Sequence, residues 1–594
     1  MRRNLFFCLI ITLLILLAYS NSFKNSFQYD DNHVIERNPF VKDPSKIPQF
    51  FVDPQFGSGI YSETSSYRPL LMATFAFNHL LGGLNVFGYH LFNFLVHLLC
   101  SFLVYFATLY IFRLTTVPTE PNSLRYQLIA LFTALVFGLH PVQTESVTYI
   151  TGRSSSLTAL FFLASFLTYM QYSLNRSVRY LVFSSLAYAC ALLVKETGIT
   201  LLAIVVLFNF MFPHGRTLKK RFLSLLPHFS LSIIYLIFRI YFFGSLQYSS
   251  QPVRPFYDNL LSQSRAWVYY LGTLILPLNL NLVYDFPVSH SVLESQVILS
   301  IFLLAGISLV IWRLSRSNRL VGFFALWFAI TLLPTNSVIA LDDLVTDRWL
   351  YLSSVGYAVL LGLTIDWIFQ KRIEQGSRTG KIVFFFLCAL VVELYGFSTL
   401  LRNFDWTSQR TLWEATVAKS PNNGPAYNAL GLALVLQGRL EEGREKFQQA
   451  ITLDPRGGKS YVNLGYVYSL QGNLDKAIEF YQKAIPLNPI LLPEIYNNLG
   501  LTYLKQGKME DSEKYLRRSI DLRPHNAAPH YNLGLYFEKR GDINQAISCE
   551  GIATKLDPDY PLPYEALSRL YKKKGWSEKS QEAYQNFLKY SKNN

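Results

Sequence analysis

The residues best suited to chemistry in this chain are short runs of charged side chains that lie beside long apolar stretches. Asp30 and Asp31 directly follow the first of these stretches. Two neighbouring carboxylates at a membrane surface are suited to general-base catalysis or to cation binding. The alternative is an ordinary solvated loop, because acidic loop residues are mostly exposed. The residues alone leave both interpretations open.

Two further loops carry ionisable residues at the edges of apolar stretches. One holds Arg68 just before a proline, a pattern that also begins many helices. The other is a tight turn that holds His140, Glu145 and Arg153. Ionisable groups this close to hydrocarbon are functional hypotheses by default, although polar ends are ordinary in a membrane hairpin.

Three other positions offer charge near the same kind of boundary. Lys195 and Glu196 are adjacent in a hairpin, where a local ion pair is the alternative to a functional role. Arg239 lies near the end of an apolar stretch, where its alternative is to snorkel toward the headgroups.

The last outer loop contains Asp347, Arg348, Trp349 and Tyr351 in close succession. An arginine at a membrane interface can hold a lipid phosphate through two parallel hydrogen bonds, which lysine cannot do. The alternative is interfacial anchoring, in which the two aromatic rings sit at the headgroup level and the guanidinium faces the headgroups.

Membrane-spanning helices must position these residues. The 594 residues are 51% hydrophobic and only 16% charged, which is typical of a membrane protein. Each span needs about 20 apolar residues, because hydrocarbon offers no partner to an open backbone. Eleven stretches are expected to span: 4–20, 87–112, 126–144, 155–173, 179–194, 197–213, 222–243, 292–312, 320–337, 349–370 and 381–401.

Clusters of Lys and Arg lie on alternate sides of these stretches, as the positive-inside rule requires. All of them face the cytoplasm only if residues 264–278 do not cross, and the Arg, Trp, Tyr and Pro in that segment favour the outer interface. The first stretch has a cleaved signal peptide as its alternative, because Arg2 and Arg3 precede a short apolar core. Both arrangements place residues 21–86 outside the cytoplasm.

Several functional classes are disfavoured by composition. The net charge of +15 comes from short clusters between apolar runs, not from a basic stripe with stacking aromatics, so we expect no nucleic-acid partner. The five cysteines have neither a disulfide framework nor metal-ligand spacing, so we expect no metal site.

After residue 403 the chain changes character and a repeat of about 34 residues begins. Its Leu-Gly pairs are Leu430-Gly431, Leu464-Gly465, Leu499-Gly500 and Leu533-Gly534, with a degenerate copy at Leu567-Ser568. This period and pattern predict a tetratricopeptide (TPR) α-solenoid, whose concave groove usually binds an extended peptide. We expect a membrane domain over 1–403, a cap or linker helix over 404–425 and a TPR domain over 426–594.

Five motifs, in this order, give the chain a family resemblance. They are Tyr29–Asp31, Tyr67–Leu70, His140–Arg153, Lys195–Thr200 and Asp347–Gly356. Together with the C-terminal repeats they resemble the transmembrane and TPR repeat-containing O-mannosyltransferases, which are C-type glycosyltransferases. The resemblance covers nearly the whole chain, although family members often carry more repeats.

The resemblance implies an all-α polytopic bundle that moves a hexose, mannose in this family, from a polyprenyl- or dolichyl-phosphate carrier to Ser or Thr hydroxyls with inversion. It implies that Asp30, beside Asp31, acts as the base. It also implies that Arg153 and Arg348 bind the carrier phosphate, and we add Arg239 and Arg68 to that set. We expect supporting roles for His140, Glu145, Lys195, Glu196, Asp347 and Tyr351.

The same resemblance sets the expected partners and location. The donor phosphate is already a leaving group, so no cofactor or divalent metal is expected to be required. The lipid bilayer, the lipid-linked sugar and an acceptor protein in the TPR groove are the expected partners. Eleven crossings would place the repeats outside the cytoplasm, in the periplasm of a bacterial inner membrane or in the lumen of the endoplasmic reticulum.

Rival interpretations stay open. One is a membrane-anchored TPR scaffold for envelope assembly, because repeats alone signal only binding. Another is a transferase that acts on a glycan or lipid acceptor. A transporter is disfavoured, because the spans show neither an internal repeat nor ionisable residues near mid-bilayer.

Overall fold

The computed structural model describes residues 2–57, 67–115, 124–213, 217–243, 254–336, 340–373 and 378–591. Every regular element within these segments is helical, which confirms the all-α prediction for the described residues. The chain divides into two compact units, Met1–Lys419 and Ser420–Asn594.

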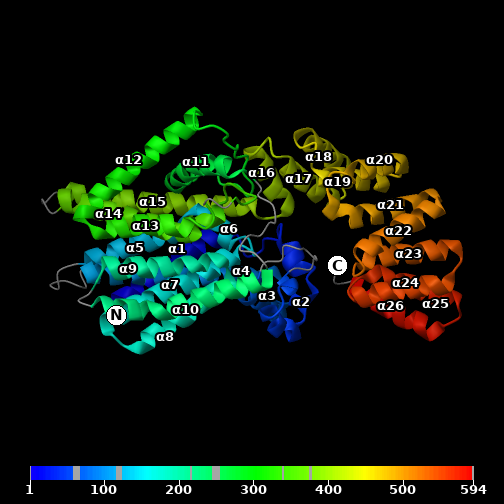
Figure 1. Ribbon diagram of the computed structural model, residues 1–594, viewed down its shortest axis with the longest axis horizontal. Helices are drawn as coiled ribbons and strands as arrows, with labels where there is room; N and C mark the ends of the chain where they lie inside the picture. Colours follow the sequence, from blue (N-terminus) through cyan, green and yellow to red (C-terminus); the bar gives the residue numbers. More distant parts are fainter. Residues whose placement is uncertain are drawn as a thin grey trace. The chain divides into compact units, whose positions relative to one another are not determined.

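The first unit is built from long helices joined by short helical turns (Figure 1). Its longer helices are α1 (Arg2–Tyr19), α3 (Pro69–Gly82), α4 (Val86–Thr115), α5 (Leu124–Leu139), α7 (Arg153–Asn175), α8 (Val178–Val194), α9 (Thr200–Met211), α10 (Leu218–Phe243), α11 (Phe256–Ile275), α12 (Ser295–Ser317), α13 (Arg319–Leu332), α14 (Leu350–Ile373), α15 (Arg378–Asp405) and α16 (Gln409–Lys419). Its short elements are α2 (Pro39–Lys42), α6 (Thr144–Val147), η1 (Asn32–Glu36), η2 (Pro44–Phe51), η3 (Pro54–Gly57), η4 (Pro141–Gln143), η5 (Glu196–Ile199) and η6 (Asp347–Trp349).

The protein is an integral multi-pass membrane protein. Among the described helices, the seven that are long and apolar enough to cross a bilayer are α1, α4, α7, α10, α12, α14 and α15. The α5 helix adds an eighth if it forms one span with Pro141–Val147 across a bend of 48°. The predicted interfacial segment 264–278 falls largely in α11, which is not in this set.

Length and hydropathy therefore support seven or eight spans, fewer than the eleven expected. The other three predicted spans coincide with shorter apolar helices, namely α8, α13 and the segment Glu196–Met211 that contains α9. The 14 residues of α13 extend only about 21 Å at 1.5 Å per residue, less than a hydrocarbon core of about 30 Å. The spans predicted at 197–213 and 320–337 run past the ends of α9 and α13, whereas α8 fills its predicted segment but has only 17 residues.

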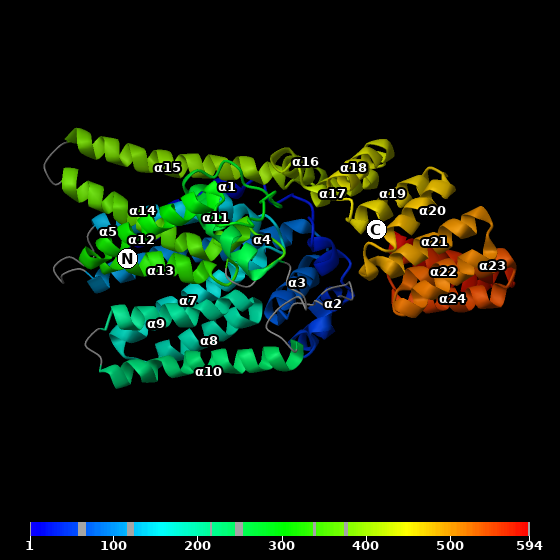
Figure 2. The ribbon, with the colours of Figure 1, turned by 45° about the horizontal axis from the view of Figure 1, so that its top comes forward.

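Close helix contacts in the first unit depend on small residues. A Cβ atom added to Gly138 on α5 would lie 2.5 Å from Ile15 Cδ1 on α1. Small residues let helices approach closely where lipid supplies no hydrophobic driving force. Figure 2 shows α14 and α15 running side by side, and α8, α9 and α10 grouped together. Helix ends that carry the predicted site residues consequently meet at one end of the bundle.

The second unit consists of five antiparallel helix pairs (yellow to red in Figure 1). They are α17 (Gly424–Leu436) with α18 (Leu440–Leu453), α19 (Gly458–Leu470) with α20 (Leu474–Ala484), α21 (Leu492–Gln506) with α22 (Met509–Leu522), α23 (Ala527–Arg540) with α24 (Ile543–Leu556), and α25 (Pro561–Lys573) with α26 (Ser577–Ser591). A turn, η7 (Pro489–Leu491), precedes α21. The fifth pair is complete, and its turn uses Gly575 at φ +76°, like Gly541 at φ +90° in the fourth.

One buried carboxylate departs from the repeat pattern. A Cβ atom added to the glycine of each Leu-Gly pair would meet the second helix within 3 Å, at Phe447, Tyr481, Leu516 and Glu550 in turn. Glu550 thus occupies a place that is apolar in the three preceding repeats. Its side chain is buried, neither carboxylate oxygen has a hydrogen-bond partner within the described chain, and burial raises its pKa to about 9.

Replacing Glu550 should stabilise the repeat unit and change its pH dependence. Burial raises the folded-state pKa above the ordinary value of 4.5, so the folded unit keeps a proton that the unfolded chain has lost. Stability should therefore fall as pH rises from about 5 toward 9, by at most ~1.4 kcal/mol per pH unit. Glu550→Leu should raise the free energy of unfolding by roughly 1–3 kcal/mol at pH 8 and remove this slope.

Thermal unfolding of residues 420–594 at pH 5.5 and pH 8 measures both effects. The matched control is Glu445→Leu, which removes an exposed glutamate from α18. Equal pH slopes in Glu550→Leu and the unsubstituted unit would contradict the assignment of the slope to Glu550.

Candidate active site

A polar cavity of about 300 Å³ lies where helix ends converge in the first unit. The loop after α1, the start of α3, the α6–α7 turn, the α8–α9 hairpin and the segment before α14 all contribute to its wall. Its predicted site residues are Asp30, Arg68, Lys195, Glu196 and Arg348. These five side chains come from four loops that are distant in sequence.

Asp30 is presented to the cavity by a constrained loop. The preceding residue, Tyr29, has φ +46°, in the left-handed region that side chains with a Cβ rarely adopt. Such a conformation costs on the order of 1–3 kcal/mol and persists only when neighbours hold it. The backbone N–H of Asp30 donates to Tyr149 Oη at 3.1 Å, and the Tyr29 ring packs edge-on against Trp413 at 5.7 Å. The loop is thereby fixed before any ligand binds.

Asp31 has a different environment from its neighbour. It is fully buried, and its two oxygens accept from the backbone N–H groups of Gln28 and Thr151, each at 2.8 Å. Burial raises the pKa of Asp31 to about 7, although these two hydrogen bonds oppose the shift. Asp31 ties the first loop to the α6–α7 turn and does not line the cavity.

Arg348 is oriented by a buried carboxylate. Its Nη1 donates to Glu145 Oε1 at 2.9 Å, and its backbone N–H donates to Glu145 Oε2 at 2.9 Å. Glu145 is only 1% exposed, whereas the Arg348 side chain keeps 24% exposure toward the cavity. Asp343 lies 3.8 Å from Nη2 of the same guanidinium. Glu145 therefore supports Arg348 without lining the cavity.

Two more cations face the same space. Arg68 Nη2 pairs with Glu196 Oε1 at 3.1 Å, and Lys195 Nζ donates to Ser155 Oγ at 3.0 Å. Burial, with the nearby charge of Arg68, lowers the pKa of Lys195 to about 7. Three cationic side chains and the Asp30 carboxylate thus share one cavity, an arrangement suited to an anionic group beside a proton acceptor.

Neither Arg153 nor Arg239 lines the cavity. The guanidinium of Arg153 is fully buried and donates to Asn93 Oδ1 at 2.6 Å, Thr74 Oγ1 at 3.1 Å and the Tyr89 carbonyl at 3.1 Å. It also lies over the Phe92 ring, 4.3 Å from the centroid. These contacts occupy Arg153 in joining α3, α4 and α7.

Arg239, near the end of α10, donates from Nη1 to Tyr235 Oη at 3.3 Å. Neither it nor Arg153 lines the cavity, so we do not assign either one to the phosphate.

Three predicted supporting residues lie outside the cavity and form hydrogen bonds between neighbouring segments. His140 Nε2 is 2.9 Å from the Leu274 carbonyl, and Tyr351 Oη is 2.7 Å from His97 Nδ1. Asp347 Oδ1 accepts from Tyr284 Oη at 2.5 Å. None of the three lines the cavity. Among the described residues, no three His, Cys, Asp or Glu side chains gather closely enough to hold a metal ion.

Some cavity residues carried no clear signal in the sequence. Tyr149, Thr151, Ser154, Thr335 and Trp349 line the wall beside the charged groups. Tyr149 is the most consequential, because its hydroxyl holds the Asp30 backbone. Its place inside the His140–Arg153 motif was the only available signal, since a single tyrosine at a membrane boundary usually anchors the helix.

Known proteins resemble both parts of the chain. The tetratricopeptide repeat family matches residues 424–456, 458–490, 493–526 and 563–594. Protein O-mannosyl-transferase Tmtc3 of Drosophila melanogaster is 26% identical over 525 residues, covering 76% of this chain and 55% of the relative. Protein O-mannosyl-transferase TMTC1 of Homo sapiens is 25% identical over 505 residues, covering 74% and 54%.

The chain is thus a distant homologue of the TMTC protein O-mannosyltransferases over about three quarters of its length. It spans little more than half the length of these two curated relatives. Among solved structures, the crystal structure of MamA covers 27% of this chain and 95% of its own, with 21% identity and a TM-score of 0.24. The resemblance predicted from the five motifs is therefore confirmed at the level of the family.

Replacing Arg153 should weaken the fold without a specific effect on the donor. Arg153→Lys keeps the charge but loses directed hydrogen bonds in a buried site, at a cost of about 2–4 kcal/mol. We expect a lower melting temperature of the purified protein in detergent. Arg68→Lys, at a partly exposed site, is the matched stability control and should change the melting temperature less. An unchanged melting temperature with weakened donor binding would instead assign Arg153 to the phosphate.

Proposed function

We propose that this chain transfers a hexose, mannose by family relationship, from a polyprenyl- or dolichyl-phosphate carrier to Ser or Thr hydroxyls of proteins. One observation carries the proposal: Asp30 shares a cavity with Arg68, Lys195 and Arg348. A proton acceptor beside fixed cations is what glycosyl transfer from a lipid phosphate requires, because a hydroxyl must lose a proton while a phosphate leaves.

An apolar groove beside this cavity supports a lipid-linked donor. The groove has a volume of about 520 Å³ and is lined mainly by α9, with Phe229 of α10 and Ile330 of α13. A small polar hollow lies at the same helix ends; it includes Thr197 and Thr331 and shares Lys195 and Arg348 with the cavity. Thr197 is two residues from the groove residue Ile199, and Thr331 adjoins Ile330. A molecule with an anionic head group and a long apolar tail would match the charged cavity at one end and the apolar groove at the other.

The proposed step needs no cofactor. Asp30 accepts the proton of an acceptor hydroxyl as the hydroxyl oxygen bonds to the anomeric carbon from the face opposite the phosphate. The bond between the anomeric carbon and the phosphate oxygen breaks, and its electron pair leaves with the phosphate. Arg348 and Lys195 neutralise the charge that grows on that phosphate. The configuration at the anomeric carbon inverts.

We assign acceptor binding to the repeat unit. One position recurs every 34 or 35 residues in its first helices, at Leu436, Leu470, Lys505, Lys539 and Lys573. Leu436 and Leu470 are 69% and 46% exposed, and the three lysines are also exposed. This surface favours an extended acceptor segment with apolar residues followed by acidic ones. We place this surface, like Asp30, on the extracytoplasmic side (periplasm or lumen) from the distribution of Lys and Arg between the apolar segments, a placement that requires an odd number of crossings.

Asp30→Asn should abolish transfer while leaving the protein folded. General-base catalysis contributes about 10²–10⁴-fold, so we expect turnover to fall at least ~100-fold, with donor binding retained. The assay is sugar transfer from synthetic polyprenyl-phosphate mannose to a Ser/Thr peptide. Asp31→Asn is the contrast: its amide keeps one acceptor oxygen and loses the other, so one of two buried backbone hydrogen bonds is lost and the melting temperature should fall. Full turnover by Asp30→Asn would exclude Asp30 as the base. Transfer to a glycan but not to the peptide would favour the alternative of a transferase that acts on a glycan acceptor.

Filling the apolar groove should weaken only long-chain donors. Ala203 is an exposed groove residue of α9, and Ala203→Trp should raise the KM for a polyprenyl donor about tenfold or more. A donor analogue with a tail of a few carbons should be unaffected. Leu299→Trp is the matched control, because the Leu299 side chain on α12 is 69% exposed and lies outside this groove. An unchanged KM for the long-chain donor would exclude the groove as the tail site.

A further inference from the structure

The loop that presents Asp30 is fastened along the junction between α15 and α16. Asn25 Nδ2 donates to the Asn403 carbonyl at 3.2 Å, and the Ser26 backbone N–H donates to the Thr407 carbonyl at 3.3 Å. Gln28 Nε2 donates to the Trp406 carbonyl at 3.3 Å. The first loop and the end of the membrane unit, nearly 400 residues apart in sequence, therefore form one structure.

Aromatic contacts extend this junction to Asp30 itself. Trp413 of α16 is 5% exposed and packs edge-on against Tyr29, with 5.7 Å between ring centroids. Trp406 stacks on Tyr149, with centroids 5.5 Å apart and planes 19° apart. Tyr29 precedes Asp30 in the chain, and Tyr149 accepts its backbone N–H. Tyr29 and Tyr149, which hold the Asp30 backbone, thus each pack against a tryptophan at the α15–α16 junction.

A second path runs from α16 to Arg348. The carbonyl of Thr416 accepts from Asn281 Nδ2 at 3.2 Å, and the backbone N–H of Asn281 donates to Tyr284 Oη at 2.9 Å. Tyr284 then donates to Asp347, the residue before Arg348, at 2.5 Å. Asn281 is 1% exposed, so water does not compete for these bonds. The α16 helix therefore contacts residues that position Asp30 and residues that position Arg348.

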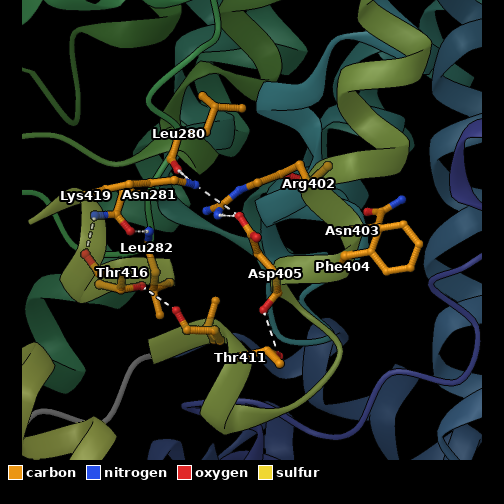
Figure 3. Close-up of polar contacts among 12 residues, drawn as sticks. Leu280, Asn281, Leu282, Arg402, Asn403, Phe404, Asp405, Thr411, Thr416 and Lys419 are labelled. Carbon is orange, nitrogen blue, oxygen red and sulfur yellow. Dashed lines mark hydrogen bonds and ion pairs between the residues drawn. The ribbon is translucent and has the colours of Figure 1, made fainter. Parts of the chain in front are cut away.

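A polar cluster fixes the two ends of α16 (Figure 3). Lys419 Nζ donates to the Leu280 carbonyl and to Asp405 Oδ2, each at 3.0 Å, and Arg402 Nη1 donates to the same carboxylate oxygen at 2.5 Å. Thr411 Oγ1 donates to the Asp405 carbonyl at 3.3 Å. Asp405 thus joins the end of α15 to the start and the end of α16.

We infer that α16 is a positioning element of the active site, in which Trp413 sets Asp30 and the Thr416–Asn281 contact sets Arg348. The inference rests on the proposed function. The first repeat helix, α17, begins only five residues after α16 ends. A single short helix therefore precedes the acceptor-binding repeats and supports the reacting groups.

Kinetics of full-length variants with polyprenyl-phosphate mannose and a short free peptide test the inference. Trp413→Ala should lower kcat by about 10–100-fold while the donor KM stays within about twofold, because a misplacement of about 1 Å costs on that scale. Trp413→Phe keeps an aromatic edge against Tyr29 and should restore most of kcat. Asn281→Ala should instead raise the donor KM by about 3–10-fold, because it removes the hydrogen bond to Thr416 that links α16 to the Tyr284–Asp347 pair beside Arg348.

Arg410→Ala is the matched control on the same helix, where Arg410 pairs with the exposed Glu414. It should leave kcat and KM unchanged. Equal kcat in Trp413→Ala and Arg410→Ala, or equal loss in Trp413→Phe and Trp413→Ala at unchanged melting temperature, would overturn the role of Trp413. An unchanged donor KM in Asn281→Ala would overturn the second path. Absence of transfer by the unsubstituted protein would refute the proposed function itself, which separates the two failures.

Discussion

The arrangement of the cavity depends on one buried ion pair, between Glu145 and Arg348. A carboxylate that is 1% exposed at the edge of hydrocarbon must have its charge compensated, and Arg348 supplies both a guanidinium N–H and its backbone N–H. The turn that holds Glu145 is equally constrained, because a Cβ atom at Gly152 would lie 2.0 Å from the Glu145 carbonyl oxygen. These two constraints fix the α6–α7 turn, and Asp31 then fixes the first loop to that turn through Thr151.

Burial separates arginines that look alike in the sequence. The fully buried guanidinium of Arg153 directs its donors to protein oxygens and its faces to aromatic rings, so it joins helices. Arg348 and Arg68 also pair with carboxylates, yet each keeps 24% of its side chain exposed. An anion can approach only the latter kind, because a new contact with a saturated guanidinium would break existing bonds. The exposed fraction of an arginine side chain therefore indicates whether it can bind an anion, which the residue type alone does not.

The sequence predicted the elements of this fold better than the directions of its side chains. Apolar runs and Leu-Gly spacing correctly indicated an all-α chain with C-terminal repeats, because both are periodic signals that report on helix faces. They predicted a longer span at 320–337 than α13 supplies, since hydropathy does not show where a helix ends. The charged motifs identified helix ends that meet, yet they did not distinguish Arg153 from Arg348 or reveal Tyr149. That information lies in side-chain orientation, which depends on contacts between segments more than 100 residues apart.

The proposed transfer would combine two substrates of opposite solubility, and the surfaces proposed for them lie in different parts of the chain. The groove on α9 is lined by apolar side chains, whereas the repeat unit exposes leucines and lysines. Only the cavity residues need to meet both substrates, so their positions must be stable while either partner comes and goes. The strained Tyr29 and the paired Arg348 are held by contacts within the protein, which preorganises them before binding. Because α16 contacts supports of both, the repeats proposed to bind the acceptor follow directly on a helix whose displacement would alter the proposed chemistry.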